Sequence, residues 1–279
     1  MMPTVRLPDG REVSAIGQGT WYMGEGRRPP SQEADALRLG IDLGMTLIDT
    51  AEMYGDGGAE RVVGQAIAGR RERVFIVTKF YPHNASRTGV PAACARSLKR
   101  LDTDVIDLYL LHWRGSVPLA ETVIALETLK EAGSIRAWGV SNLDVEDMEE
   151  LMSVAGGDQC ATDQVLYNPA YRGIEFDLLP WCTRRHIPIM AYSPVGQGGQ
   201  LLRSRALAEV AARHRATPAQ IAIAWGLRQS TVISIPKAGN PAHVRENAGA
   251  AEVVLTPEDI ALIDTAHPPP QRKQSLAML

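Results

Sequence analysis

The sequence contains few cysteines, no excess of positive charge and no long apolar run. Its three cysteines, Cys94, Cys160 and Cys182, lie far apart in a chain of 279 residues, which excludes a disulfide scaffold and any CxxC motif. Twenty-nine Lys and Arg against 32 Asp and Glu give a formal charge of −3, whereas non-specific nucleic-acid binders usually carry a positive excess. No run approaches the ~18 apolar residues of a membrane span, and the first residues contain no signal peptide. We therefore expect a cytoplasmic protein that binds neither nucleic acid nor membrane.

The composition is otherwise that of a globular protein with a large core. Hydrophobic residues make up 45% of the chain and charged residues 22%, a balance that excludes disorder as the main state. The length is compatible with two domains or with one barrel of ~250 residues. No linker or low-complexity segment divides the chain, so we expect a single domain over residues 1–279. The six histidines include no HxH or HExxH pair, and we expect no metal site.

Short apolar runs alternate with stretches of helical periodicity. Near-continuous apolar runs are typical of parallel strands buried on both faces, and their alternation with helices predicts an α/β fold, a (β/α)8 TIM barrel. A hairpin with a Pro8-Asp9-Gly10 turn precedes the barrel, and extra helices follow it. A doubly wound sheet is the alternative, but its GxGxxG fingerprint is missing. The predicted strands are 15–20, 46–51, 74–80, 105–113, 135–141, 164–168, 188–193 and 232–236, and the predicted helices are 31–43, 59–68, 91–101, 119–132, 145–154, 219–228 and 260–266.

Polar residues recur where the predicted strands end, which is where active sites of such barrels lie. Asp49 and Lys79 end neighbouring strands, and an ion pair between them would satisfy two charges flanked by apolar residues. Tyr54, on the loop after Asp49, could reach the ammonium; a nearby cation favours the phenolate, so we expect a lowered phenol pKa and a better proton donor. His112, from the next strand, could orient a bound carbonyl. The same residues are also compatible with a structural ion pair, a loop aromatic and a core histidine.

Five segments carry a more specific pattern. They are Gly17-Gln18-Gly19-Thr20-Trp21; Asp49-Thr50-Ala51-Glu52-Met53-Tyr54-Gly55 with Glu60 and Gly64; Leu111-His112-Trp113; Gly139-Val140-Ser141-Asn142; and Ile235-Pro236-Lys237 with Glu246-Asn247. In order and spacing the set resembles the aldo-keto reductases over nearly the whole chain. The resemblance implies a barrel that reduces aldehydes and small ketones, for example methylglyoxal, with a nicotinamide cofactor.

The resemblance also implies a role for each polar residue. Tyr54 would be the general acid, Lys79 paired with Asp49 would lower its pKa, and His112 would position the carbonyl oxygen. The cofactor would supply the hydride. Implied cofactor contacts are Ser141, Asn142 and Gln164 at the carboxamide, Tyr192 on the nicotinamide ring, Ser193, Pro194, Val195 and Gly196 at the pyrophosphate, and elsewhere Gly19, Thr20, Trp21, Asp49, Ile235, Pro236, Lys237, Ala238, His243, Glu246 and Asn247.

The adenosine end departs from the family pattern. The family often has Lys, then Ser or Thr, then an Arg six residues after the Lys, which together bind the 2′-phosphate of NADPH. Here Ala238 follows Lys237, and His243 stands at the Arg position. Arg245, two residues further on, could substitute for the missing Arg. Imidazole does not replace a bidentate Arg contact at full strength. We therefore expect NADPH as the cofactor with a weakened preference over NADH, which remains possible.

The substrate pocket is expected to have aromatic walls that suit small carbonyls. The residues assigned to it are Trp21, Tyr54, Tyr81, His112 and Trp113, although core packing is an alternative for Trp113. The tail, residues 271–279, is short, so we expect an open pocket. A cofactor-binding regulatory barrel with little turnover is the alternative function, and a barrel hydrolase or lyase would need a metal cluster or paired carboxylates that the sequence lacks. No repeat or heptad seam is present, so we expect a monomer.

Overall fold

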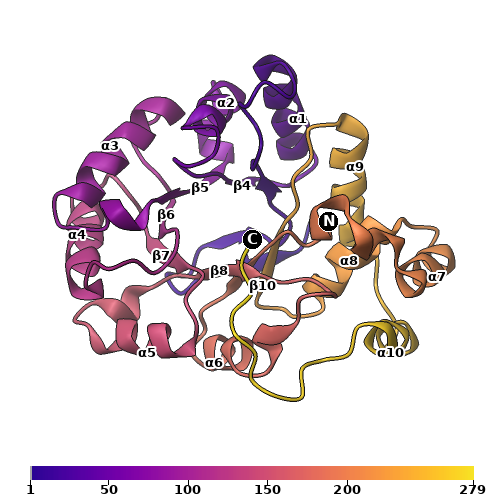
Figure 1. The fold of residues 1–279 in the computed structure, drawn as a ribbon. Coiled ribbons are helices and arrows are strands. Elements are labelled where there is room, and N and C mark those ends of the chain that lie inside the picture. The colour runs from indigo at the N-terminus through magenta and orange to yellow at the C-terminus, as the bar shows by residue number, and fades with distance from the viewer. Residues whose placement is uncertain (1) are drawn as a thin grey trace.

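The computed structural model describes residues 2–279, and eight parallel strands form its centre (Figure 1). The strands follow one another around the sheet in chain order, from β3 to β10. Each strand lies within or one residue outside a run that the apolar pattern predicts. Their bounds are β3 Gln18–Gly19, β4 Leu47–Asp49, β5 Phe75–Phe80, β6 Leu108–Leu111, β7 Trp138–Ser141, β8 Asp163–Leu166, β9 Ile189–Tyr192 and β10 Val232–Ile235.

The first and last strands join and close the sheet into a barrel. Parallel bridges connect Ile16 to Ser234 and Gly19 to Lys237, and the Gly19 amide donates to the carbonyl of Pro236 at 3.0 Å. A Cβ at Gly19 would lie 2.9 Å from the carbonyl oxygen of Ile235, so the close approach requires glycine here. The predicted (β/α)8 barrel is confirmed.

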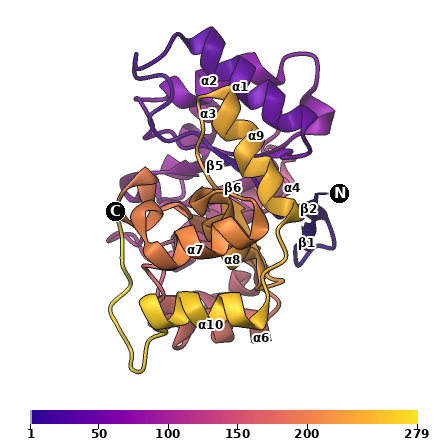
Figure 2. The same ribbon diagram turned by 90° about the vertical axis from the view of Figure 1, so that its right-hand side faces the viewer.

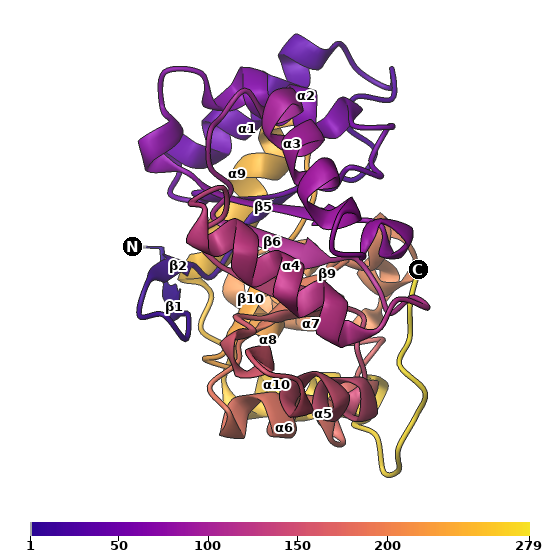
Figure 3. The same ribbon diagram turned by 90° about the vertical axis from the view of Figure 1, so that its left-hand side faces the viewer.

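A hairpin of β1 (Thr4–Arg6) and β2 (Glu12–Ser14) covers one end of the barrel. Its turn includes Gly10 at φ +88°, a left-handed conformation that favours glycine. The buried side chains of Val5 and Val13 pack with the apolar interior of the barrel. Figures 2 and 3 show this hairpin and the C-terminus at opposite ends of the barrel. The predicted N-terminal hairpin is confirmed, and it leaves only the other end open to ligands.

Eight helices surround the sheet, and two more, α7 and α10, lie outside this ring (Figures 1 and 2). Within residues 2–279, none of the helices is both long and apolar enough to cross a bilayer. The ring consists of α1 Pro30–Asp42, α2 Gly58–Ile67, α3 Gly89–Leu101, α4 Leu119–Glu131, α5 Val145–Ser153, α6 Leu178–Arg184, α8 Pro218–Leu227 and α9 Pro241–Gly249, and the outer helices are α7 Arg205–His214 and α10 Pro257–Ala266.

Capping boxes begin α8 at Thr217 and α10 at Thr256. In α10 the N3 carboxylate of Asp259 also joins α10 to α7, because it lies 2.6 Å from His214 Nε2 and 3.1 Å from Arg213 Nη1. Burial would raise the pKa of Asp259, but these hydrogen bonds outweigh it and lower the pKa to about 2. The extra C-terminal helix is thus held by both capping and charge.

Asp163, the first residue of β8, is buried without a hydrogen-bond partner of good geometry within residues 2–279. Burial raises its pKa well above the ordinary value of 3.8. A carboxyl group whose pKa is raised in the native state contributes fully to stability below its unfolded pKa. That contribution is lost as the pH rises through the native pKa.

We therefore expect Asp163→Asn to raise the free energy of unfolding by about 1–3 kcal/mol at pH 8. The gain should shrink toward pH 4, where the native carboxyl is protonated and the pH approaches the ordinary value of 3.8 for the unfolded one. Urea titrations at the two pH values measure it, with the exposed Asp158→Asn as a matched control. An equal effect at both pH values would contradict this account of Asp163.

Candidate active site

A buried ion pair connects the ends of β4 and β5. Asp49 ends β4 and pairs with Val77 of β5. Lys79 lies two residues after Val77. The Lys79 ammonium lies 2.8 Å from Asp49 Oδ1 and donates to the Thr50 carbonyl at 2.8 Å. Its third bond, 3.3 Å long, goes to the phenol oxygen of Tyr54. The predicted convergence of carboxylate, ammonium and phenol is therefore present in the structure.

The phenol of Tyr54 is held in its protonated form. Burial raises the pKa of Tyr54 above 10.0, and the attraction of Lys79 opposes this without reversing it. The predicted lowering of the phenol pKa is therefore wrong for this site, because loss of hydration outweighs the cation at 3.3 Å. Burial disfavours the ammonium of Lys79 as well, but Asp49 and Tyr54 more than offset it, so the pKa of Lys79 is raised and the ammonium stays charged.

His112 follows β6 and presents a neutral imidazole beside Tyr54. Burial lowers the pKa of His112 well below 6.5, and the charge of Lys79 lowers it further. The ring meets Tyr54 edge-on with 5.8 Å between ring centres. Its Nδ1 atom is buried and has no hydrogen-bond partner within the described residues. A neutral imidazole and a protonated phenol thus lie next to each other, and both can donate a hydrogen bond.

These groups border a cavity of about 820 Å³ at the carboxyl end of the strands. Its size matches the ~300–1,000 Å³ typical of ligand and cofactor sites. Most of the residues that the sequence assigns to cofactor or substrate line it. They are Gly19, Thr20, Trp21, Asp49, Tyr54, His112, Trp113, Ser141, Asn142, Gln164, Tyr192, Ser193, Pro194, Val195, Ile235, Lys237, His243, Glu246 and Asn247.

Hydrogen bonds fix four polar side chains along one wall of this cavity. Asn142, in the left-handed region at φ +58°, accepts from the Tyr192 hydroxyl at 3.0 Å and donates to Ser141 Oγ at 3.1 Å. The Ser141 hydroxyl donates to the Gln164 carbonyl at 2.8 Å. Gln164 Nε2 donates to Asp49 Oδ1 at 2.7 Å, a contact that sequence reasoning missed. The carboxylate beside Lys79 is thus also held from β8, and Gln164 Oε1 accepts no hydrogen bond within residues 2–279.

Five predicted site residues do not line the cavity within residues 2–279. Lys79 lies behind Asp49 and Tyr54 with no exposed surface. Tyr81 stacks on His83 with 4.8 Å between ring centres and meets Trp113 edge-on at 5.9 Å, so its ring backs the aromatic wall instead of forming it. The remaining three are Gly196, Pro236 and Ala238.

The sequence pattern described as "Aldo/keto reductase family" matches residues 15–267. The chain belongs to the aldo/keto reductase family. It is 53% identical to methylglyoxal reductase YeaE of Escherichia coli over 271 residues. The aligned part covers 96% of this chain and 95% of that protein. It is 33% identical to glyoxal reductase of Bacillus subtilis, over 94% of this chain and 91% of that protein. The predicted family and the predicted oxidoreductase class are confirmed.

Solved structures agree with this assignment. An aldo-keto reductase from Klebsiella pneumoniae in complex with NADPH has a TM-score of 0.98 and 52% identity, with full coverage of both chains. An aldo/keto reductase from the same organism in complex with NADP and acetate has a TM-score of 0.97 and also 52% identity.

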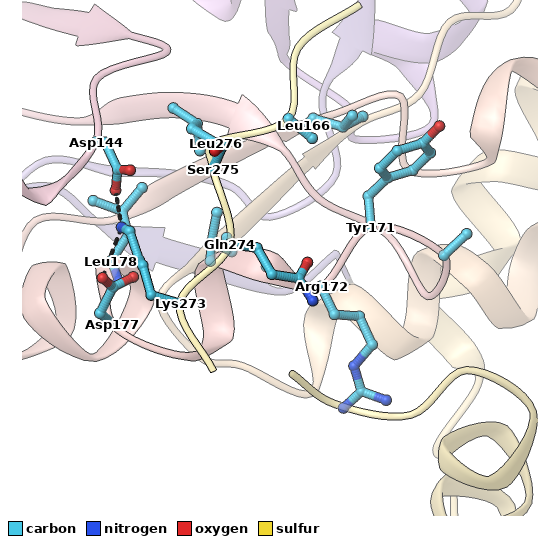
Figure 4. A pocket seen from close by; sticks show the side chains of 14 residues that line it. Asp144, Leu166, Tyr171, Arg172, Asp177, Leu178, Lys273, Gln274, Ser275 and Leu276 are labelled. Carbon is cyan, nitrogen blue, oxygen red and sulfur yellow. Dashed lines mark hydrogen bonds and ion pairs between the residues drawn. The ribbon is translucent and has the colours of Figure 1, made fainter. Parts of the chain in front are cut away.

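In this aldo/keto reductase the C-terminal tail contributes to the cavity, which sequence reasoning missed. Lys273 lies between two carboxylates, 2.5 Å from Asp144 Oδ1 and 2.7 Å from Asp177 Oδ2 (Figure 4). Met278 and Leu279 line the cavity. The tail thus covers part of the opening, and the expectation of an open pocket is wrong on this side. The pairing of Lys273 with distant carboxylates has no local sequence signal.

Other lining residues were also missed. They come from the loop between β3 and α1, from the loop between β4 and α2, from the segment after β9 and from the start of α8, and they are Tyr22, Arg27, Met53, Leu202 and Ala219. Gln197 and Gly198 also line the cavity, in a glycine-rich stretch that the sequence marks as able to fold over a bound cofactor. Irregular loops lack periodicity, so tertiary packing alone brings these side chains to the cavity.

Proposed function

We propose that this aldo/keto reductase reduces aldehydes and small ketones to alcohols with NADPH. The arrangement of Asp49, Lys79 and Tyr54 beside the cavity carries the proposal. Two relatives whose names specify methylglyoxal and glyoxal as substrates support a small dicarbonyl as the preferred class. The regulatory barrel is not favoured, because the complete set of polar groups would have no use in a protein without turnover.

The cavity also fits the proposed cofactor. Its lining combines a wall of hydrogen-bonding side chains at Asn142 and Gln164 with cations at Lys237 and Arg27. When bound, the nicotinamide supplies the hydride. Ser141, Asn142, Gln164 and the ring of Tyr192 would hold its carboxamide end, and Lys237 would face a phosphate.

The residues of this chain deliver and stabilise the proton. Tyr54 keeps its proton until a carbonyl oxygen gains negative charge, and then donates it from a position 3.3 Å from the Lys79 ammonium. Lys79 stabilises the phenolate that forms, and Asp49 keeps the ammonium in place. The neutral His112 donates a hydrogen bond to the same carbonyl oxygen and so favours the transition state.

The direct test mixes the purified protein with NADPH and a panel that includes methylglyoxal, glyoxal, apolar aldehydes and small ketones, and follows the cofactor absorbance. We expect turnover that is fastest with the small dicarbonyls. Tight NADPH binding without oxidation across the panel would support the regulatory barrel instead. The cytoplasmic location, the monomeric state and the single domain over residues 1–279 remain predictions.

The pH dependence of the reduction follows from the shifted pKa values of Tyr54 and His112. The pKa of Tyr54 lies above 10.0 and that of His112 well below 6.5, so both stay in their working forms between these values. We expect kcat/KM for reduction to change by less than about threefold from pH 7 to pH 9. A steep alkaline loss near pH 8 would show that the phenol titrates much lower than its burial implies.

A further inference from the structure

Two arginines of the loop between β3 and α1 lie near Lys237, which lines the cavity. Arg27 lines the cavity together with Lys237 and His243. Its guanidinium lies 3.8 Å from the centre of the Tyr22 ring, and that ring stacks on Trp21. Stacking on an aromatic face restricts a guanidinium while leaving its edge free to bind an anion.

Arg28 approaches the same place from the side of Gly239. A Cβ at Gly239 would lie 3.4 Å from Arg28 Cδ, 3.6 Å from Arg28 Nε and 3.8 Å from Lys237 Nζ. The arginine and the lysine therefore both pass within 4 Å of the position that a side chain at residue 239 would occupy. Burial lowers the pKa of Lys237, and repulsion from Arg27 and Arg28 contributes in the same direction, against attraction from Glu33 and Glu25.

Acidic residues do not fully neutralise this cluster, which consists of Arg27, Arg28 and Lys237. Glu25 lies 3.8 Å from Arg27, a weak contact between exposed groups. The buried carboxylate of Glu33 accepts the Gly24 amide at 2.8 Å and so holds the loop. Glu246 also lines the cavity. Within residues 2–279, however, neither Arg28 nor Lys237 forms an ion pair with a carboxylate, so both cations remain available to an anionic ligand.

We infer that Arg27 and Arg28, together with Lys237, bind the 2′-phosphate of NADPH and replace the arginine that is missing at position 243. The inference rests on the proposed function. A terminal phosphate is doubly charged near neutral pH and offers three free oxygens, one for each cation of the cluster. A phosphate within the pyrophosphate carries one charge and fewer free oxygens, so it suits this cluster less well. Arg28 and Arg245 both lie outside the cavity lining in the described chain, but Arg28 lies beside Gly239, close to Lys237, and its charge lowers the pKa of Lys237.

The test compares dissociation constants for NADPH and NADH, which differ only in that phosphate, measured by quenching of protein fluorescence. In Arg27→Ala/Arg28→Ala, affinity for NADPH should fall by about 10–100-fold, because bonds between charged groups are lost. Affinity for NADH should change less than about threefold, which also shows that the variant is folded. Arg245→Ala is the matched control and should leave both constants unchanged.

Each other result overturns the inference in a recognisable way. An equal loss for both cofactors would place the arginines on the pyrophosphate, and unchanged constants would leave them as solvated side chains. A selective loss in Arg245→Ala would restore the substitute that the sequence suggests. If the unaltered protein bound neither cofactor, the proposed function itself would fail. If the unaltered protein bound NADPH but the variants did not show the predicted affinities, only this inference would fail.

Discussion

Replacing Tyr54 with phenylalanine should lower kcat for carbonyl reduction by about 10²–10⁴-fold, the usual contribution of a positioned proton donor. The substitution removes one oxygen and keeps the ring that packs edge-on against His112. NADPH affinity should therefore remain within about threefold of the unaltered value, since only an interaction made in the transition state is lost. Steady-state kinetics with methylglyoxal and fluorescence titration with NADPH measure the two quantities.

Tyr81→Phe is the matched control for this substitution. Tyr81 is also a tyrosine near the aromatic wall, but its ring stacks on His83 and does not line the cavity. We expect its kcat to stay within about twofold of the unaltered value. Unchanged turnover in Tyr54→Phe, or an equal loss in both variants, would remove Tyr54 from the role of proton donor.

Replacing Lys79 with methionine should cause the second large effect, on both stability and activity. The substitution leaves the Asp49 carboxylate, which is 2% exposed, without its cation. Removing one partner of a buried ion pair typically costs about 3–5 kcal/mol. Activity should also fall by at least about 10²-fold, because the phenolate that forms on Tyr54 loses the ammonium that stabilises it.

The double substitution Asp49→Asn/Lys79→Met separates the two effects. It removes both buried charges, so the free energy of unfolding should recover most of the loss. Turnover should not recover, because the ammonium is still missing. Urea denaturation and methylglyoxal kinetics on the three proteins test this. If activity returned along with stability, Lys79 would serve only to hold the fold.

The barrel and the convergence of Asp49, Lys79 and Tyr54 could be predicted from sequence because each has a local signal. Buried parallel strands require near-continuous apolar runs. Asp49 and Lys79 interrupt those runs with charge at the strand ends, so each must find a partner inside the structure. Strand order along the chain then brings these two residues together.

The missed elements have weaker or non-local signals. Helix α9 buries only Val244 and Asn247, so it lacks an apolar stripe. Helix α7 does have buried residues at helical spacing, but it lies outside the alternation of strands and helices. The positions of Arg27 and of residues 273–279 depend on tertiary contacts that no local pattern encodes.

The direction of the Tyr54 pKa could not be predicted for a different reason. The sequence shows that a cation can come near the phenol, but it does not show how completely the group is removed from water. In the structure burial outweighs Lys79, so the phenol stays protonated. In the proposed mechanism Lys79 therefore stabilises the phenolate during the reaction and does not ionise the phenol beforehand.

The most direct test of the central claim follows an isotopic label during a single turnover. The protein is mixed with NADPH that carries deuterium at the transferable position of the nicotinamide and with methylglyoxal in ordinary water, and the alcohol is analysed by mass spectrometry and NMR. The account predicts deuterium on the carbinol carbon and a proton from the solvent pool on its oxygen, with the rate of label transfer greatly reduced in Tyr54→Phe. Oxidation of NADPH without label in the alcohol, or label transfer at an undiminished rate in that variant, would contradict it.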